Sequence, residues 1–183
     1  IVCLDSDQAV VLIDILDSQR SHLCDNILNF KNAAVFDLAT VFMLAYPYGY
    51  PVLMSSYAFD EDNNPVPTSS PHDPGTGCGE DWVCEHRRPL ATTMVEFRKT
   101  TAGTPVLSWV VEEGVVSFSR GNLGHIVINT GDEAINVTLG TGLADGEYAD
   151  QLGGGATAVV DGRQMRVPVE PRSAIAFLAE GYR

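Results

Sequence analysis

Two different patterns of hydrophobic residues divide the chain near residues 103–105. Before this point, a continuous apolar run over residues 9–14 predicts a strand buried on both faces, as in a parallel sheet. Apolar residues at helical spacing over residues 32–46 and 89–101 predict two helices, and residues 51–57 predict a second short strand. Strand, helix, strand, long loop and helix make two βα units, which cannot close a sheet by themselves.

After residue 105, short apolar stretches alternate with glycine-rich turns. Regular short strands of this kind are typical of an antiparallel β-sandwich. We therefore expect an α/β region over residues 1–103 followed by an all-β domain over residues 104–183. The second of these is expected to fold by itself.

Composition and charge restrict the partners of the chain. The 183 residues are 45% hydrophobic and 19% charged, which is ordinary for a globular protein. The formal net charge of −13 opposes binding to nucleic acid and to anionic lipid surfaces. No apolar stretch approaches the roughly 20 residues of a membrane-spanning helix. The chain begins with Ile1 and no signal region precedes it, so we expect it to be part of a longer protein.

The cysteines and one short motif favour an oxidising compartment. Four cysteines without a C-x-x-C pair are typical of disulfides rather than of a redox motif. The sequence Asn136-Val137-Thr138 matches the acceptor motif for N-glycosylation and is compatible with secretion. The sequence does not decide whether Cys3 and Cys24 form a disulfide with each other.

A cluster of polar residues follows the first predicted strand. Asp14, Asp17, Gln19 and Arg20 come together where a buried parallel strand ends. Active sites of open α/β sheets and of βα barrels lie at this end of the strands. An ion pair of Arg20 with Asp17 or Asp14 that only stabilises the end of the strand is the alternative, and these residues alone do not decide between the two.

Metal sites within the chain are not predicted. Residues 60–64 start like a calcium-binding EF-hand loop, but Pro65 stands where a glycine is required and Pro71 where a glutamate is required. Cys78, Cys84 and His86 lack the fourth ligand and the spacing of a zinc site.

Several longer motifs resemble the α-amylases of glycoside hydrolase family 13. L-I-D-I-L-D-S-Q-R at residues 12–20 resembles the family motif F-V-D-N-H-D-x-Q-R, and F-M-L-A-Y-P-Y-G at 42–49 and W-V-C-E-H-R at 82–87 also look like amylase sequence. The resemblance continues into residues 119–129. It implies that residues 1–103 are the last two βα units of a (β/α)₈ TIM barrel, and that residues 104–183 are an antiparallel Greek-key β-sandwich.

The resemblance implies a function for the longer protein. It would cleave internal α-1,4 bonds of starch, glycogen or maltooligosaccharides with retention of configuration, which requires a nucleophilic carboxylate and a proton donor. Both of those residues would precede this chain, so the 183 residues alone are expected to be inactive. Asp17 corresponds to the third acid of the family, which stabilises the transition state.

Further expectations follow from the same resemblance. His22 matches a histidine that contacts substrate, although an exposed loop histidine without a ligand is the alternative. Cys78 and Cys84 are expected to form a disulfide. Calcium is implied for the longer protein, with its ligands outside this chain, and a secreted monomer is expected.

Three residues depart from the family pattern. Leu16 stands where the family has a histidine that donates to sugar hydroxyls, and Ile15 and Val52 replace the Asn and the Arg or Lys that hold chloride. We therefore expect no chloride dependence. A sugar hydroxyl without its partner costs on the order of 1–3 kcal/mol, which corresponds to about ten- to a hundredfold in rate. The alternative function is consequently a catalytically impaired amylase-like protein or a non-catalytic glucan-binding fragment.

Overall fold

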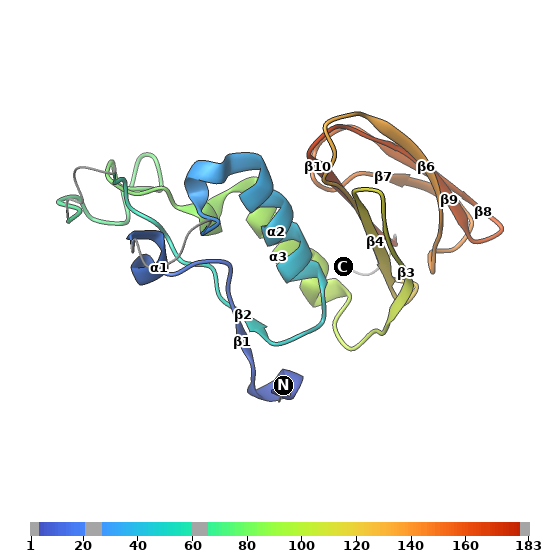
Figure 1. Cartoon of the computed structure of the whole chain (residues 1–183), viewed down its shortest axis with the longest axis horizontal. Helices are drawn as coiled ribbons and strands as arrows, with labels where there is room; N and C mark the ends of the chain where they lie inside the picture. Colours follow the sequence, from blue (N-terminus) through green and yellow to red (C-terminus); the bar gives the residue numbers. More distant parts are fainter. Residues whose placement is uncertain (1–3, 21–26, 60–65, 180–183) are drawn as a thin grey trace.

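A computed structural model describes residues 4–20, 27–59 and 66–179 of the chain. Two long helices lie between a region of loops and a two-sheet sandwich (Figure 1). The helices of the first part are α1 (Leu16–Arg20), α2 (Ala33–Ala45) and α3 (Pro89–Thr100), with short 3₁₀ turns η1 (Ser6–Gln8), η2 (Phe30–Asn32) and η3 (Glu85–Arg87).

The parallel strand pair of the first part is shorter than the sequence predicts. Strand β1 (Val10–Val11) pairs in parallel with β2 (Tyr50–Pro51), whereas the apolar runs predicted strands over residues 9–14 and 51–57. Among the described residues β1 pairs with no other strand, and Val10 is 63% exposed. A parallel strand is buried only when other elements cover both its edges and both its faces. The prediction that this strand is buried on both faces is therefore wrong.

A close approach between backbones brings the start of β2 onto β1. Gly49, in the turn after α2, has a φ of +65°, and a Cβ atom there would lie 2.8 Å from a methyl group of Val11. Any other residue would both strain this backbone and collide with β1. The glycine of the P-Y-G sequence therefore permits the parallel pair.

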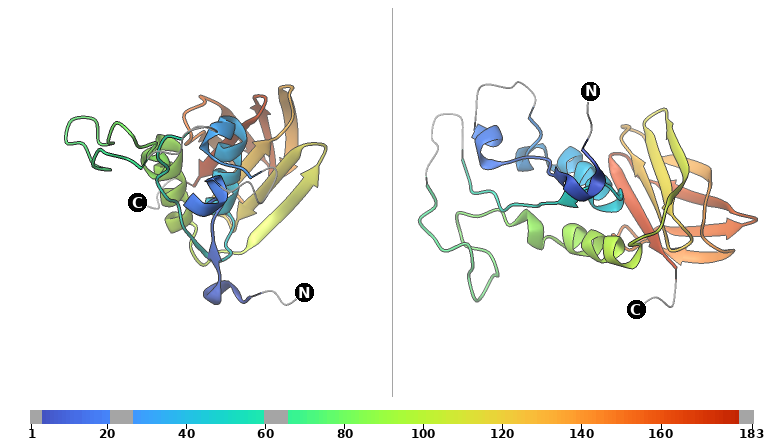
Figure 2. Two further views of the ribbon diagram at one scale, coloured as in Figure 1. Left: turned by 60° about the vertical axis from the view of Figure 1, so that its left-hand side comes forward. Right: turned by 90° about the horizontal axis from the view of Figure 1, so that it is seen from below.

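The two predicted helices are confirmed. Helix α2 ends before Pro47, where the Tyr46 N–H donates to the Phe42 carbonyl, and α3 has Pro89 at its first turn. Helices α2 and α3 pack side by side (Figure 2). Leu44 of α2 and Met94 and Phe97 of α3 are buried in one core with residues of the adjoining sheet.

The second part is an antiparallel sandwich, as expected. One sheet has the order β10-β5-β4-β3 and the other the order β6-β9-β8-β7, and all their pairings are antiparallel. The Greek-key description of the connections stays a prediction. The strands are β3 (Val106–Glu112), β4 (Val115–Arg120), β5 (Gly124–Asn129), β6 (Ile135–Gly140), β7 (Gly146–Ala149), β8 (Thr157–Asp161), β9 (Gln164–Val169) and β10 (Ser173–Leu178).

Sequence analysis missed one strand, β7. Its four residues, G-E-Y-A, show no apolar run, and only Tyr148 is partly buried. An edge strand has one neighbour and needs few apolar residues. The hydrogen-bonded pairing with β8 therefore identifies β7, which its own sequence pattern does not.

The inner strand β5 of the first sheet is covered on both of its faces. Phe118 and Ile126 face the helices, while Val127 and Phe177 face the second sheet. Every residue of β5 is consequently buried. The sheet therefore joins two hydrophobic cores, one shared with α2 and α3 and one within the sandwich.

Arg120, at the end of β4, connects this sheet to both helices. Its side chain is only 2% exposed, and its guanidinium donates to the carbonyls of Ala45 (2.6 Å) and Thr101 (3.0 Å) at the C-terminal ends of α2 and α3. Burial and the nearby positive charge of Arg98 lower the pKa of Arg120. The negative ends of the helix dipoles oppose this effect and favour the charged form.

Replacing Arg120 should destabilise the chain strongly. We expect Arg120→Met to lower the free energy of unfolding by about 3 kcal/mol, because buried helix-end carbonyls lose a charged donor. Urea unfolding followed by circular dichroism measures this. Arg166→Met, on the exposed face of β9, is the matched control and should change stability little; equal effects of the two substitutions would contradict the role of Arg120.

His125 adds an acid-sensitive group to the sandwich core. The imidazole is fully buried between the hydroxyls of Ser117 (2.8 Å) and Ser119 (2.7 Å), and burial lowers its pKa to about 4. An unfolded histidine titrates near 6.5. Between these values the unfolded state binds the proton and the folded state does not, so stability falls as the pH falls.

His125→Gln should remove this dependence. For the unchanged chain we expect a loss of about 2 kcal/mol between pH 7 and pH 5 from this group. Glutamine does not titrate, so the variant should lose about 2 kcal/mol less over the same interval when urea unfolding is measured at both pH values. A pH dependence identical in the two proteins would show that His125 is not responsible.

Candidate functional site

Asp17 lies at the start of α1, directly after the segment that follows β1. Its side chain is exposed. The turn that carries it is held by Ser18, whose hydroxyl donates to the Ile15 carbonyl and accepts from the Ile15 N–H, both at 3.0 Å. The sequence thus presents a carboxylate to solvent from a short, hydrogen-bonded turn.

A buried polar cluster lies behind this turn. The side-chain amide of Gln19 donates to the Asp14 carboxylate and to the Ser56 hydroxyl, the latter at 2.7 Å. Asp14 is 7% exposed, and Gln19 and Ser56 are also buried. The cluster therefore joins α1 to the segment that follows β2.

Glu85 extends the cluster from the other side of the disulfide loop. One oxygen of its carboxylate accepts the Ser56 N–H at 2.8 Å, while the other, Oε1, is buried without a partner among the described residues. Burial raises the pKa of Asp14, the Gln19 hydrogen bond lowers it, and the charge of Glu85 raises it again. The net shift is upward, so Asp14 holds its proton more readily than an ordinary aspartate.

Arg20 points to aromatic rings rather than to the acids of its own segment. Its guanidinium lies 3.8 Å from the ring centre of Tyr57 and 4.5 Å from that of Phe59, and donates to the Tyr57 carbonyl at 3.1 Å. Asp14 and Asp17 form no ion pair with it within the described part of the chain. The alternative in which Arg20 pairs with one of these acids is therefore not observed.

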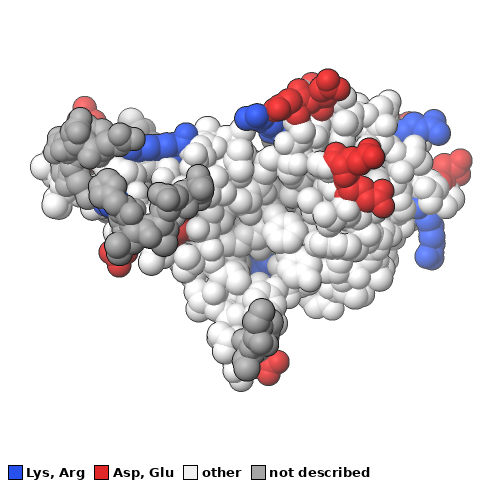
Figure 3. Space-filling model, viewed as in Figure 1, with Lys and Arg blue, Asp and Glu red and all other residues white. Residues whose placement is uncertain are grey.

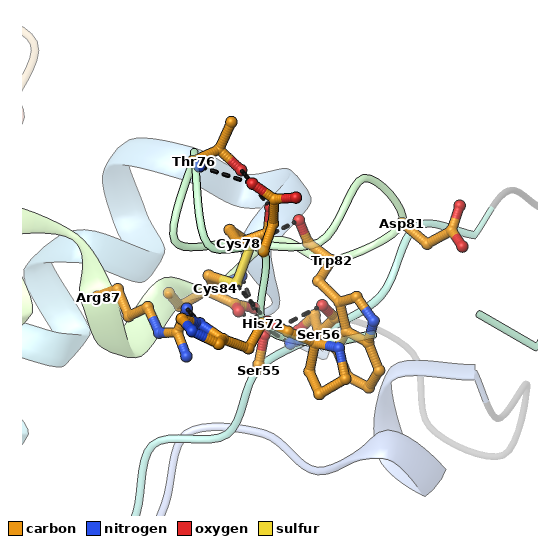
Figure 4. Close-up of a disulfide and its surroundings, with 12 residues drawn as sticks. Ser55, Ser56, His72, Thr76, Cys78, Asp81, Trp82, Cys84 and Arg87 are labelled. Carbon is orange, nitrogen blue, oxygen red and sulfur yellow. Dashed lines mark hydrogen bonds between the residues drawn. A yellow bond between two sulfur atoms is a disulfide. The ribbon is translucent and has the colours of Figure 1, made fainter. Parts of the chain in front are cut away.

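The Cys78–Cys84 disulfide anchors the long loop beside the cluster (Figure 4). The two Cα atoms are 6.1 Å apart, and the Cys84 N–H donates to the Ser55 hydroxyl at 3.0 Å. Trp82, inside the disulfide loop, donates from its indole N–H to the Ser69 carbonyl at 3.1 Å. Because Glu85 directly follows Cys84, the disulfide helps to place its carboxylate against Ser56.

The residues that depart from the family motif have exposed side chains. Ile15 is 43% and Leu16 is 40% exposed next to Asp17, and Val52 lies exposed after β2. These hydrocarbon side chains offer no donor to a sugar hydroxyl or to an anion. His22, Cys3, Cys24 and residues 60–64 lie outside the described residues.

Ser56 and Glu85 were not assigned to the site from the sequence, and Gln19 was named in the polar cluster without a role. Gln19 and Glu85 lie within motifs that were noted, D-S-Q-R and W-V-C-E-H-R, yet no spacing rule relates the two. Each of them contacts Ser56, so the chain must bring residues on either side of α2 together, which the sequence pattern does not describe.

Comparison with known proteins now adds to this geometry. Residues 109–180 match the family model for the alpha amylase C-terminal all-beta domain. The chain is 40% identical over 167 residues to pancreatic alpha-amylase 2a5 of Mus musculus, and 39% identical over 167 residues to human pancreatic alpha-amylase. The chain is thus similar to α-amylases and carries their C-terminal all-beta domain. Each alignment covers 81% of this chain and 33% of the relative, so the chain spans about a third of the length of these proteins.

The structure agrees with this assignment. Wild-type alpha-amylase I from Eisenia fetida superposes with a TM-score of 0.79 at 34% identity, covering 96% of this chain and 42% of that one. Its E249Q mutant, solved as a maltohexaose complex, superposes equally well at 35% identity. The similarity thus extends beyond the sandwich to the helices and the Asp17 segment.

The described part of the chain offers neither a cluster of metal ligands nor a membrane-spanning helix. The described residues contain no group of three or more His, Cys, Asp or Glu side chains placed to hold a metal ion. None of the described helices is long and apolar enough to cross a membrane. On the face seen in Figure 3, acidic side chains gather over the sandwich.

Gln19 provides a test of the buried cluster. Gln19→Ala removes the amide that links Asp14 to Ser56, so we expect the free energy of unfolding to fall by about 2 kcal/mol, since buried polar groups lose their partner. Gln151→Ala, an exposed glutamine, is the control and should have little effect. Urea unfolding distinguishes the two; a Gln19 variant as stable as its control would show that the cluster does not stabilise α1.

Proposed function

We propose that this chain is the C-terminal part of a retaining α-amylase that hydrolyses internal α-1,4 bonds of starch, glycogen or maltooligosaccharides. Residues 1–103 would be the last two βα units of its (β/α)₈ barrel, and residues 104–183 its C-terminal domain. The observation that carries the proposal is the exposed carboxylate of Asp17, held after a parallel strand by the buried Gln19 contacts. Barrel enzymes place catalytic groups at this position.

The proposed role of Asp17 follows from the charge that develops during cleavage. Retaining hydrolysis passes through an oxocarbenium-like transition state between a nucleophilic carboxylate and a carboxylic acid. A third carboxylate that hydrogen-bonds the sugar hydroxyls there would stabilise the distorted ring. The nucleophile and the proton donor would come from the preceding part of the longer protein, so this chain by itself would not catalyse the reaction.

Further proposals concern the substrate contact of His22, the ions that the longer protein binds, and its location. His22 is proposed to contact the substrate. Calcium, if bound as the family resemblance implies, would use ligands that precede this chain. Chloride is not expected, because Ile15 and Val52 present only hydrocarbon groups. We propose that the protein is secreted, because its disulfide is of the kind that oxidising compartments favour. A monomeric state is proposed as well.

A second candidate function rests on Leu16. An exposed hydrocarbon side chain beside Asp17 cannot donate a hydrogen bond to the sugar. The missing interaction is worth on the order of 1–3 kcal/mol, or about ten- to a hundredfold in rate if it acts in the transition state. The alternative is thus an amylase-like protein with weak or no catalysis that retains glucan binding.

Asp17→Asn in the longer protein tests the proposal. The amide keeps the shape of the side chain but removes its charge, so kcat for starch hydrolysis should fall by at least about a hundredfold, an effect of roughly 3 kcal/mol on the barrier. Release of reducing sugar is the measurement. Asp7→Asn, an exposed acid in η1, is the matched control and should leave the rate unchanged.

The same assay separates the two candidate functions. A large loss in the Asp17 variant alone supports the enzyme. Near-zero rates in the unchanged protein and in both variants, with binding of maltohexaose retained, support the non-catalytic alternative.

A further inference from the structure

The Asn136-Val137-Thr138 motif lies on β6, an edge strand of the second sheet. Its side chains alternate: Asn136 and Thr138 are exposed, while Val137 is partly buried and Leu139 is buried in the sandwich core. Successive residues of a strand point to opposite faces. The two side chains that define the motif therefore share the outward face of the sheet.

Within the described part of the chain, these two side chains make no hydrogen bond or ion pair. The hydrogen bonds of the described residues include none from the Asn136 amide or from the Thr138 hydroxyl. By contrast, the exposed Thr130 hydroxyl donates to the Gly114 carbonyl at 2.8 Å. Opposite Asn136 in the sheet stands Pro168, which has no N–H to donate. Modification of the Asn136 amide would consequently break no interaction of the folded chain.

The surface around Asn136 has room for a sugar. Asn136 and Thr138 line a shallow depression of about 570 Å³ together with Val159, Arg166 and Pro168. Val159 is 50% exposed, and Arg166 and Pro168 are exposed beside it. An apolar floor next to polar side chains suits the mixed surface of a pyranose ring. No aromatic residue lines the depression, so it lacks the stacking platform on which a free glucan would bind.

We propose that Asn136 is an N-glycosylation site, and that the innermost sugar of its glycan rests in this depression. The reaction joins Asn136 Nδ2 to the anomeric carbon of a lipid-linked oligosaccharide diphosphate. The bond between that carbon and the phosphate oxygen breaks, the lipid diphosphate leaves, and the amide loses one proton. The inference rests on the secretion proposed above but not on catalytic activity.

A glycan here would also protect the sheet. Among the described strands β6 pairs with β9 alone and lies at the edge of its sheet, so its other edge has backbone groups without a strand partner there. Exposed edges of this kind are templates for pairing with other chains, and proteins commonly cover them. A bulky, hydrated group on the edge strand would oppose such pairing.

The test expresses the protein that carries this chain through the secretory pathway of yeast or insect cells. Glycan is released enzymatically in heavy-oxygen water, which converts a glycosylated asparagine to a labelled aspartate that peptide mass spectrometry locates. We expect the label at position 136 in most molecules. The oligosaccharide is transferred before the chain folds, so a chain that fails to leave the cell can also carry the glycan. Molecules retained in the cell are therefore analysed by the same labelling.

Matched variants separate the motif from its surroundings. Thr138→Ser keeps the hydroxyl and should remain glycosylated, whereas Thr138→Val keeps the shape of the side chain and should lose the label, as should Asn136→Gln. An unmodified Asn136 in the unchanged protein, while other glycoproteins of the same cells carry glycans, would overturn the proposal. Starch hydrolysis is not part of this readout, so a protein without amylase activity can still carry the glycan.

Discussion

A buried guanidinium, that of Arg120, links the two parts of the chain beside the hydrophobic core that they share. Arg120 ends a strand of the sandwich, yet its hydrogen bonds go to the last carbonyls of α2 and to the turn after α3. Two helices that end at the same place each leave carbonyls without partners within the helix. A charged donor with a rigid, planar set of N–H groups can satisfy both ends at once. This contact adds to the apolar packing of the sheet against the helices in the shared core around Phe97 and Phe118.

In the candidate site, too, one buried polar side chain joins separate segments through its hydrogen bonds. Gln19 uses a neutral amide to connect Asp14 with Ser56, and Glu85 reaches the backbone of Ser56 from the loop closed by the Cys78–Cys84 disulfide. Asp17 itself makes no contribution to this cluster. A buried scaffold therefore supports an exposed carboxylate, an arrangement that fixes the position of the carboxylate while leaving its oxygens available to a ligand.

The elements predicted correctly are those whose burial is visible in the spacing of their own apolar residues. The helical spacing around Val41 and Met94 predicted α2 and α3 because apolar residues at that spacing are buried in each helix, Leu38, Val41 and Ala45 in α2 and Ala91, Met94 and Phe97 in α3. The parallel strand at Val10 came out shorter and more exposed, because its burial depends on neighbours rather than on its own apolar residues. β7 escaped prediction for the opposite reason, since its pairing with β8 needs no apolar run.

The sequence by itself determined the family, the two-part organisation, the acid at position 17 and the hydrocarbon residues beside it, because these are properties of motifs and spacing. Tertiary structure alone decided that Gln19, Ser56 and Glu85 meet behind Asp17, and that the Arg20 guanidinium lies over the Tyr57 ring. It also decided that the glycosylation motif lies outward on an edge strand. Contacts between residues distant in the chain follow from how the helices and sheets pack, and no local pattern encodes that packing.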